Sequence, residues 1–325
     1  MNKNFISKLL EQHDFINVYE IGSRGGAFKD LQKYQKNINY FGFEANEDEC
    51  KKLNLDANKH TVFNKEVYYQ KGVGGEIKRS SLYVTSQPGC SSFLEPNKKI
   101  LKFYNRQEWY EIDDVYEIQT SSLESIKNEL KLESPDFLKI DVEGMDLEIL
   151  KGLGDSIDDV LGLRMEINYL DHRKQQPSVG EIFTYLEENN FYVFDFLENH
   201  SWRLDSKMGD KYIKFNEINY SKGQLAHGDI LAFKNPIDII ESPKYNLSTK
   251  IKYAALLDCY GYISHVNTIF QSKAFNKIFS EKQSIENKKF LIASSKSLLF
   301  SRVIQRISDS FGFLKTNLKF FFERR

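Results

Sequence analysis

The stretch from Phe137 to Gly152 constrains the fold of this 325-residue chain more than any other feature. It reads FLKIDVEGMDLEILKG, so a short apolar run is followed by Asp141, Glu143 and Gly144, and then by a segment rich in leucine and isoleucine. This order predicts a buried strand that delivers two carboxylates and turns at a glycine into a helix. Ligands of α/β proteins bind outside the carboxyl ends of the sheet strands. The stretch therefore also predicts where a site lies.

Segments typical of strands alternate with segments typical of helices up to residue 236. Such alternation predicts an α/β fold, namely a doubly wound, mostly parallel sheet with helices on both faces, and the last strand pair is expected to be antiparallel. Residues 81–84 are expected to form a hairpin with the third strand. The predicted domain spans residues 1–236, and residues 237–325 are predicted to form a helical C-terminal extension. The expected strands are 15–21, 39–43, 60–69, 137–142, 160–167, 191–196 and 229–233, with helices at 27–35, 45–53, 122–130 and 179–189.

An earlier strand end, with the sequence EIGSRGG beginning at Glu20, points to a nucleotide-like cofactor. Glycines at such a junction let the backbone approach a ligand closely. The dinucleotide-binding fingerprint needs glycine at its first, third and sixth positions, but Arg24 and Ala27 occupy the third and the sixth. The spacing of Glu20, Gly22 and Gly26 instead suits S-adenosylmethionine, which has no pyrophosphate and carries an ammonium group that needs an acid nearby.

Glu44 supports this interpretation. It ends the second expected strand, about twenty residues after the glycine turn, where an acid can accept hydrogen bonds from both ribose hydroxyls. The alternative is that Glu20 and the glycines form an ordinary tight turn. A nicotinamide-dependent oxidoreductase is less favoured, because Arg24 and Ala27 interrupt its fingerprint.

The run from Lys139 to Gly144 resembles the signature of the FkbM family of S-adenosylmethionine-dependent methyltransferases. The family's usual opening is Asp-Val-Gly-Ala-Asn, whereas this chain has Glu-Ile-Gly-Ser-Arg from Glu20. The resemblance implies a class I methyltransferase-like Rossmann fold, S-adenosylmethionine as methyl donor, and methyl transfer to a hydroxyl, often of a sugar or a natural product. It covers roughly residues 18–235 and includes the glycine turn, Gly42-Phe43-Glu44, Gly89-Cys90-Ser91-Ser92, Arg164-Met165-Glu166, Gln176-Pro177 and Gly228-Asp229-Ile230-Leu231.

Three acids and one histidine are the candidate catalytic residues. Asp141 and Glu143 come first as general base or as acceptor-orienting groups, because a hydroxyl is a poor nucleophile until its proton leaves. Glu166 follows, and then His172, since a histidine is a natural base near neutral pH; a surface-loop histidine is the alternative. The three acids could instead hold a divalent cation, but no metal is expected because no residue here demands one. The residues expected to bind the cofactor are Glu20, Gly22, Ser23, Gly26, Glu44 and Asp141.

Two further features bear on the pocket and the acceptor. Ser91 and Ser92 lie on a loop that is expected to fold over the cofactor pocket, unless it is a solvated turn. Trp202, together with Arg203, could stack on a sugar face, although a tryptophan that packs against the sheet is the more common outcome.

Composition limits the partners and the compartment. A formal net charge of −1 argues against nucleic-acid binding. Cys50, Cys90 and Cys259 are scattered, which argues against a disulfide framework and against a structural zinc site. The sequence shows neither a signal peptide nor an apolar run of the ~18 residues that a membrane span needs. We therefore expect a cytoplasmic protein.

The C-terminal end is basic, with only Asp309 and Glu323 as acids after Lys288. Apolar residues recur there every three or four positions, which predicts a basic amphipathic helix. Such a helix can lie on an anionic membrane surface, or it can pack on the protein or on a second subunit, which we favour.

The sequence as a whole predicts an S-adenosylmethionine-dependent O-methyltransferase. The expected acceptor is a hydroxyl of a sugar, a glycan precursor or a small metabolite. The alternative is a non-catalytic cofactor-binding or scaffold protein with the same fold, and the presence of Glu44, Asp141 and Glu143 argues against it.

Overall fold

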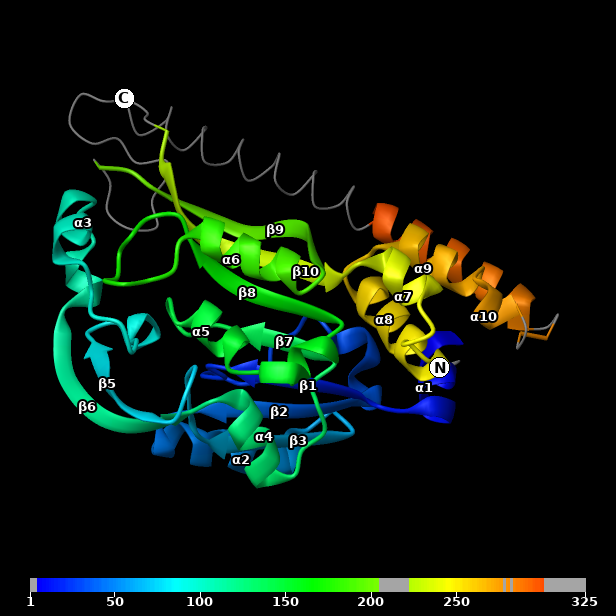
Figure 1. The fold of residues 1–325 in the computed structure, drawn as a ribbon, viewed down its shortest axis with the longest axis horizontal. Coiled ribbons are helices and arrows are strands. Elements are labelled where there is room, and N and C mark those ends of the chain that lie inside the picture. The colour runs from blue at the N-terminus through cyan, green and yellow to red at the C-terminus, as the bar shows by residue number, and fades with distance from the viewer. Residues whose placement is uncertain (1–4, 205–221, 277–278, 281–282, 301–325) are drawn as a thin grey trace, which may run out of the picture. The chain divides into compact units, whose positions relative to one another are not determined.

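A computed structural model describes residues 5–204, 222–276, 279–280 and 283–300 (Figure 1). The chain divides into two compact units. The described residues of 15–29 and 35–242 form the larger unit, which contains all the strands described. The described residues of 5–14, 30–34 and 243–300 form the smaller unit.

The larger unit is built on a seven-stranded sheet. In their order across the sheet, the strands are β3 (Lys65–Gln70), β2 (Ile38–Glu44), β1 (Ile16–Ile21), β7 (Phe137–Ile140), β8 (Gly162–Asn168), β10 (Gln224–Lys234) and β9 (Phe191–Trp202). The first five are parallel to one another, whereas β10 is antiparallel to both β8 and β9. The chain builds the sheet in one direction from β1 to β3 and in the other from β7, so the sheet is doubly wound. The predicted fold class is confirmed.

Helices cover both faces of this sheet (Figure 1). The helices of the larger unit are α2 (Glu47–His60), α3 (Lys98–Phe103), α4 (Leu123–Leu130), α5 (Asp146–Lys151), α6 (Val179–Glu188) and α7 (Pro236–Glu241). The leucines and isoleucines of α4, α5 and α6 share one core with sheet residues such as Tyr19, Ile140 and Met165. Val67 and Tyr69 of β3 face this core. The residue between them, Tyr68, belongs to the opposite face, where Asn54 of α2 donates to its carbonyl oxygen at 2.8 Å.

Three shorter strands form a second sheet, in the order β4 (Gly72–Val73), β6 (Ile112–Ser121) and β5 (Lys78–Thr85). The hairpin predicted between residues 81–84 and the third strand is wrong, because β5 pairs antiparallel with β6. β4 pairs in parallel with the end of β6. Both β4 and β5 therefore pair with β6 in the second sheet, and β5 does not pair with β3.

The helix predicted over residues 27–35 does not form. A turn is followed by a 3-10 helix, η1 (Gln32–Asn37), in which Tyr34 has the non-helical angles φ −120° and ψ 19°. The hydroxyl of Tyr34 and Nζ of Lys33 both contact the buried Asp258, at 2.5 and 2.6 Å. These long-range contacts outweigh the helical pattern of the local sequence.

The smaller unit is helical. Its helices are α1 (Phe5–His13), α8 (Leu247–Cys259), α9 (Ile263–Phe270), α10 (Lys273–Asn276) and a further helix over residues 283–300. The ring of Phe5 contacts the rings of Phe270, Phe279 and Phe290. The predicted domain boundary at residue 236 places α1 with the sheet, but α1 packs with the C-terminal helices because its apolar side chains join their aromatic core. The larger unit extends to residue 242.

The predicted basic tail helix is described only as far as residue 300. In that part Ile292, Leu299 and Phe300 are 47%, 66% and 67% exposed, so the described residues do not bury them. Residues 301–325 lie outside the described part of the chain. No helix in that described part is long and apolar enough to cross a membrane.

Gly22 and Asp141 meet at the ends of β1 and β7. The backbone N–H of Asp141 donates to the carbonyl of Ile21, and that of Gly22 donates to the carbonyl of Phe43, each at 3.0 Å. Gly22 has a φ of +80°, and a Cβ at this position would lie 2.1 Å from the carbonyl oxygen of Asp141. Only glycine fits here without moving the loop that follows β7.

Replacing Gly22 with alanine should lower the free energy of unfolding by about 2 kcal/mol more than the same replacement at Gly25. Both positions have a left-handed backbone, with φ of +80° and +85°, which costs an L-residue about 1–2 kcal/mol. Nothing lies within 4 Å of a Cβ at Gly25, whereas overpacking at Gly22 adds about 1–3 kcal/mol. Urea unfolding measures the difference. Equal stabilities of the two variants would contradict the close contact at Gly22.

Candidate functional site

The loop after β7 places Asp141 and Glu143 at the carboxyl edge of the sheet. Glu143 has a φ of +61° and Gly144 a φ of +107°. A left-handed conformation is uncommon for a residue with a side chain, and such strain collects at functional sites. A Cβ at Gly144 would lie 3.2 Å from Leu94 and 3.4 Å from Arg173, so the turn is closely packed by its neighbours.

Arg173 and Ser92 hold Glu143 in this conformation. Nη2 of Arg173, whose side chain is fully buried, donates to Glu143 Oε2 at 2.5 Å and to the carbonyl of Cys90 at 2.8 Å. Its guanidinium lies 5.2 Å from the centre of the Tyr110 ring. Oγ of Ser92 donates to the carbonyl of Glu143 at 2.8 Å. Burial raises the pKa of Glu143, and the charge of Arg173 works in the opposite direction.

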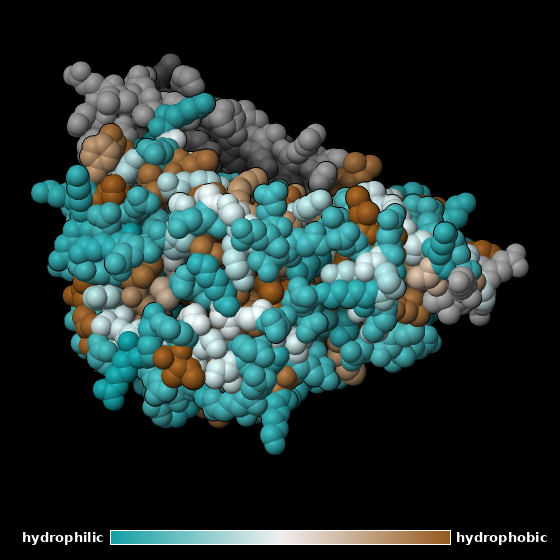
Figure 2. Space-filling model, in the orientation of Figure 1, coloured by the Kyte–Doolittle hydropathy of each residue, from teal (hydrophilic) through white to brown (hydrophobic). Residues whose placement is uncertain are grey.

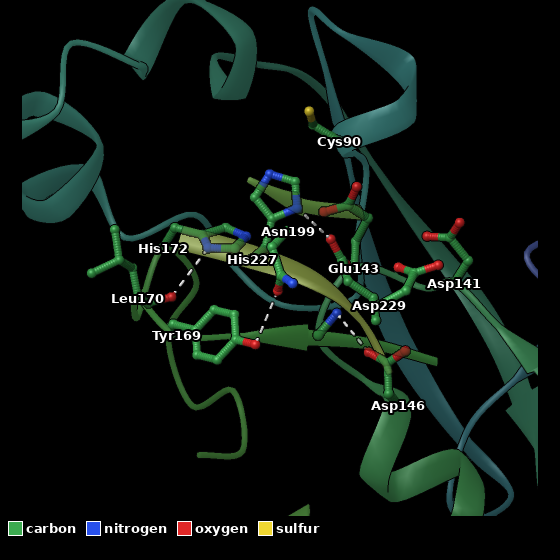
Figure 3. A network of polar contacts seen from close by, with 12 residues as sticks. Cys90, Asp141, Glu143, Asp146, Tyr169, Leu170, His172, Asn199, His227 and Asp229 are labelled. Carbon is green, nitrogen blue, oxygen red and sulfur yellow. Dashed lines mark hydrogen bonds and ion pairs between the residues drawn. The ribbon is translucent and has the colours of Figure 1, made fainter. Parts of the chain in front are cut away.

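Asp141, Glu143 and Glu166 form a carboxylate cluster, in which one oxygen from each lies within 4.8 Å of the others. Figure 3 shows Asp141 and Glu143 together beside Asp229. The exposed fraction of the side chain falls from 48% for Asp141 to 19% for Glu143 and 9% for Glu166. Burial, followed by the charges of Glu143 and Asp141, raises the pKa of Glu166 well above its ordinary value. Of the three acids, Asp141 is the most accessible.

Two cations from the sheet lie beside the cluster. Nζ of Lys139 lies 2.9 Å from Asp141 Oδ2 and 3.9 Å from Asp229 Oδ2. Nε of Arg164 donates to Asp229 Oδ2 at 2.5 Å. No lysine or arginine among the described residues forms an ion pair with Glu166.

His227, which the sequence did not suggest as a site residue, is the partner of Glu166. Its Nδ1 lies 3.0 Å from Glu166 Oε1, and its ring stacks on that of His200 with centroids 4.7 Å apart. Burial lowers the pKa of His227, which favours the neutral ring. The sequence shows only that His227 and Asp229 share a face of their strand, because they are two residues apart. The pairing of the strands, which sets Asp229 directly opposite Glu166, is a feature of the tertiary structure.

His172 is not a member of the carboxylate cluster. Its side chain is 1% exposed, its Nδ1 lies 3.1 Å from the carbonyl oxygen of Leu170 (Figure 3), and its ring packs against those of Tyr110 and Trp202. Burial lowers its pKa to about 3. Trp202 is itself only 3% exposed, so it occupies the packed position rather than an open sugar-stacking one.

Glu20 and Ser23 lie beneath the glycine turn. Glu20 is 6% exposed, and its Oε2 accepts hydrogen bonds from the backbone N–H of Phe28 at 3.0 Å and from the hydroxyl of Tyr40. Burial raises its pKa to about 7. The side chain of Ser23 is fully buried, and its hydroxyl has no hydrogen-bond partner among the described residues.

Glu44, Gly25 and Gly26 lie at the same part of the site as Glu20. Glu44 ends β2, and its Oε1 accepts a hydrogen bond from the backbone N–H of Asn46 at 2.8 Å. Burial raises its pKa. Gly25 and Gly26 both have a left-handed backbone, and Gly25 has open space around it. Because β1 and β2 are parallel neighbours, the glycine turn and Glu44 share one edge of the sheet.

Comparison with known proteins gives a family. The family model for the FkbM methyltransferase domain matches residues 20–193. No curated protein matches the chain.

Several solved methyltransferase structures show a weak likeness. A precorrin-6y C5,15-methyltransferase from Geobacter metallireducens has 14% identity over 70% of this chain and 85% of its own, with a TM-score of 0.32. TrmK from M. capricolum has 12% identity over 90% and 95%, with a TM-score of 0.32. An O-methyltransferase from Thermotoga maritima has 11% identity over 71% and 63%, again with a TM-score of 0.32. Likeness at this level says nothing about the reaction of this chain.

The residues present fit S-adenosylmethionine. Glu44 has a second carboxylate oxygen, Oε2, that would accept hydrogen bonds from ribose hydroxyls, and the open space at Gly25 would admit a ligand close to the backbone. Glu20 would supply an acid under the turn for the ammonium group of the methionine part. The chain therefore belongs to the FkbM methyltransferase family, and S-adenosylmethionine is its methyl donor.

Proposed function

We propose that this protein is an O-methyltransferase that acts on a hydroxyl of a sugar, a glycan precursor or another small metabolite. The carboxylate cluster at the end of β7 is the observation that supports this most directly. Ionised carboxylates only accept hydrogen bonds, so the cluster favours an acceptor that donates them. The neighbouring hydroxyls of a sugar ring match such a surface.

Bound S-adenosylmethionine supplies an electrophilic methyl group on its sulfonium. The contribution of the chain is to align the acceptor oxygen and to remove its proton. Asp141 is the best-placed group for the proton, because it is the most exposed acid of the cluster and its own position is fixed by Lys139. Through its contact with Gly22, it also adjoins the glycine turn.

The other predicted catalytic residues take different parts in this proposal. Glu143 orients the acceptor, since Arg173 already holds its Oε2. Glu166 lies deeper, with a side chain that is 9% exposed. His172 is enclosed by aromatic rings, so we assign it to packing.

Glu44→Ala should weaken the binding of S-adenosylhomocysteine by about 1–3 kcal/mol, the cost of losing a hydrogen-bond acceptor that carries charge. Isothermal titration calorimetry measures the change. Glu47→Ala is the matched control, because Glu47 begins the following helix and its side chain is 57% exposed; it should bind as the wild type does. Equal loss in both variants would argue against a ribose contact at Glu44.

Asp141→Asn should lower kcat about 100-fold or more, since it removes the base and keeps the size of the side chain. S-adenosylhomocysteine release from a panel of sugars and glycans measures turnover, and calorimetry should show that S-adenosylhomocysteine still binds. Glu148→Gln, a change at an exposed acid of α5, serves as the control. Full turnover by Asp141→Asn would transfer the role to another member of the cluster.

The affinity for S-adenosylhomocysteine should rise between pH 6 and pH 8. Glu20 has a pKa raised to about 7 by burial, so below that pH it is mostly neutral, and a bound ammonium group must first displace its proton. The gain is at most about tenfold per pH unit. Calorimetry of the wild type and of Glu20→Gln across this range tests the idea, because the rise should be absent in the variant. An identical rise in both proteins would show that another group titrates.

A further inference from the structure

We propose that Asp141, Glu143 and Glu166 form a binding site for a hard divalent cation, with Mg²⁺ as the natural occupant. The binding itself does not depend on which acceptor is methylated. Its use in catalysis rests on the proposed O-methyl transfer.

The geometry of the cluster suits one shared ion. Each acid offers an oxygen, and these oxygens lie within 4.8 Å of one another. In an octahedral Mg²⁺ site, with Mg–O distances of about 2.0–2.1 Å, adjacent oxygens are about 2.9 Å apart and opposite ones about 4.2 Å apart. Small movements of the side chains therefore bring all three to a common centre. Donors that are all oxygen favour Mg²⁺, Ca²⁺ or Mn²⁺ over softer metals.

Glu166 supplies a second observation. Its side chain is 9% exposed, and its Oε2 is buried without a hydrogen-bond partner among the described residues. Buried carboxylate oxygens normally have a partner. Its other oxygen faces Nδ1 of His227 at 3.0 Å, and this contact would orient the carboxylate as hydrogen bonds to metal-binding carboxylates generally do.

The ion pairs around the cluster leave Glu166 without a lysine or arginine partner among the described residues. Some acids around the cluster have a cationic partner, whereas Glu166 and Asp146 have no such ion pair in the described part of the chain. Asp146 is 1% exposed, and its Oδ1 also lacks a hydrogen-bond partner. The acids that do have partners are Asp141 with Lys139, Glu143 with Arg173 and Asp229 with Arg164.

A cation held by three protein oxygens keeps coordination positions for water or for an acceptor oxygen. A hydroxyl bound to it loses its proton more easily. Asp141, the most exposed of the three acids, can take that proton while the acceptor oxygen receives the methyl group. The cation would thus position the acceptor and activate it at the same place.

To test the site, the full chain is first freed of metal with a chelator and then titrated with Mn²⁺. Electron paramagnetic resonance measures how much of the Mn²⁺ is bound. We expect one bound Mn²⁺ per chain, displaced by excess Mg²⁺. Glu166→Gln should weaken Mn²⁺ binding at least 30-fold, because the amide keeps the shape and loses the charge. Glu148→Gln is the control for an exposed acid and should leave binding unchanged.

Asp141→Asn is the second variant, chosen because Asp141 is exposed and its replacement should leave the core intact; it should weaken Mn²⁺ binding at least 10-fold. Circular dichroism checks that each variant is folded. Absence of Mn²⁺ binding by a wild-type protein that still binds S-adenosylhomocysteine would overturn the site, as would wild-type affinity in Glu166→Gln. Mn²⁺ binding without methylation of any hydroxyl acceptor would instead refute the proposed function and leave the cation site standing.

Discussion

The close contact between Gly22 and the carbonyl of Asp141 is the constraint on which the rest of the site depends. The ends of β1 and β7 lie side by side where the order of the strands reverses, which is where ligands bind in open α/β sheets. A side chain at Gly22 would lie 2.1 Å from that carbonyl and would displace the turn that carries Glu143. The contact between Gly22 and Asp141 therefore joins the glycine turn, where we expect the cofactor, to the loop that carries the carboxylates.

Around this contact, the fold gives three acids three different surroundings. Asp141 is half exposed beside Lys139, Glu143 is held by a buried arginine, and Glu166 is buried with a histidine. Carboxylates close together in a buried place repel each other, and burial opposes their ionisation. A proton or a cation must relieve that repulsion. The way in which it is relieved therefore also decides what the acids can do chemically.

Local patterns predicted the seven segments that form the strands of the main sheet, because a buried strand followed by a turn has a recognisable sequence pattern. They failed where partners far along the chain decide the structure. The helix expected at residues 27–35 yields to contacts with Asp258, and the strand that contains residues 81–84 pairs with β6 instead of β3. Likewise, α1 joins aromatic residues found more than 250 positions later.

The sequence by itself determined the α/β class, the family resemblance and the acids at the strand ends, because strand, turn and acid follow one another within a few residues. Only the tertiary structure decided which groups surround those acids. Arg173 reaches Glu143, and His227 reaches Glu166, across separations of 30 and 61 positions that no local pattern records. It also enclosed His172 among rings, because packing, and not residue type, decides whether a histidine meets solvent.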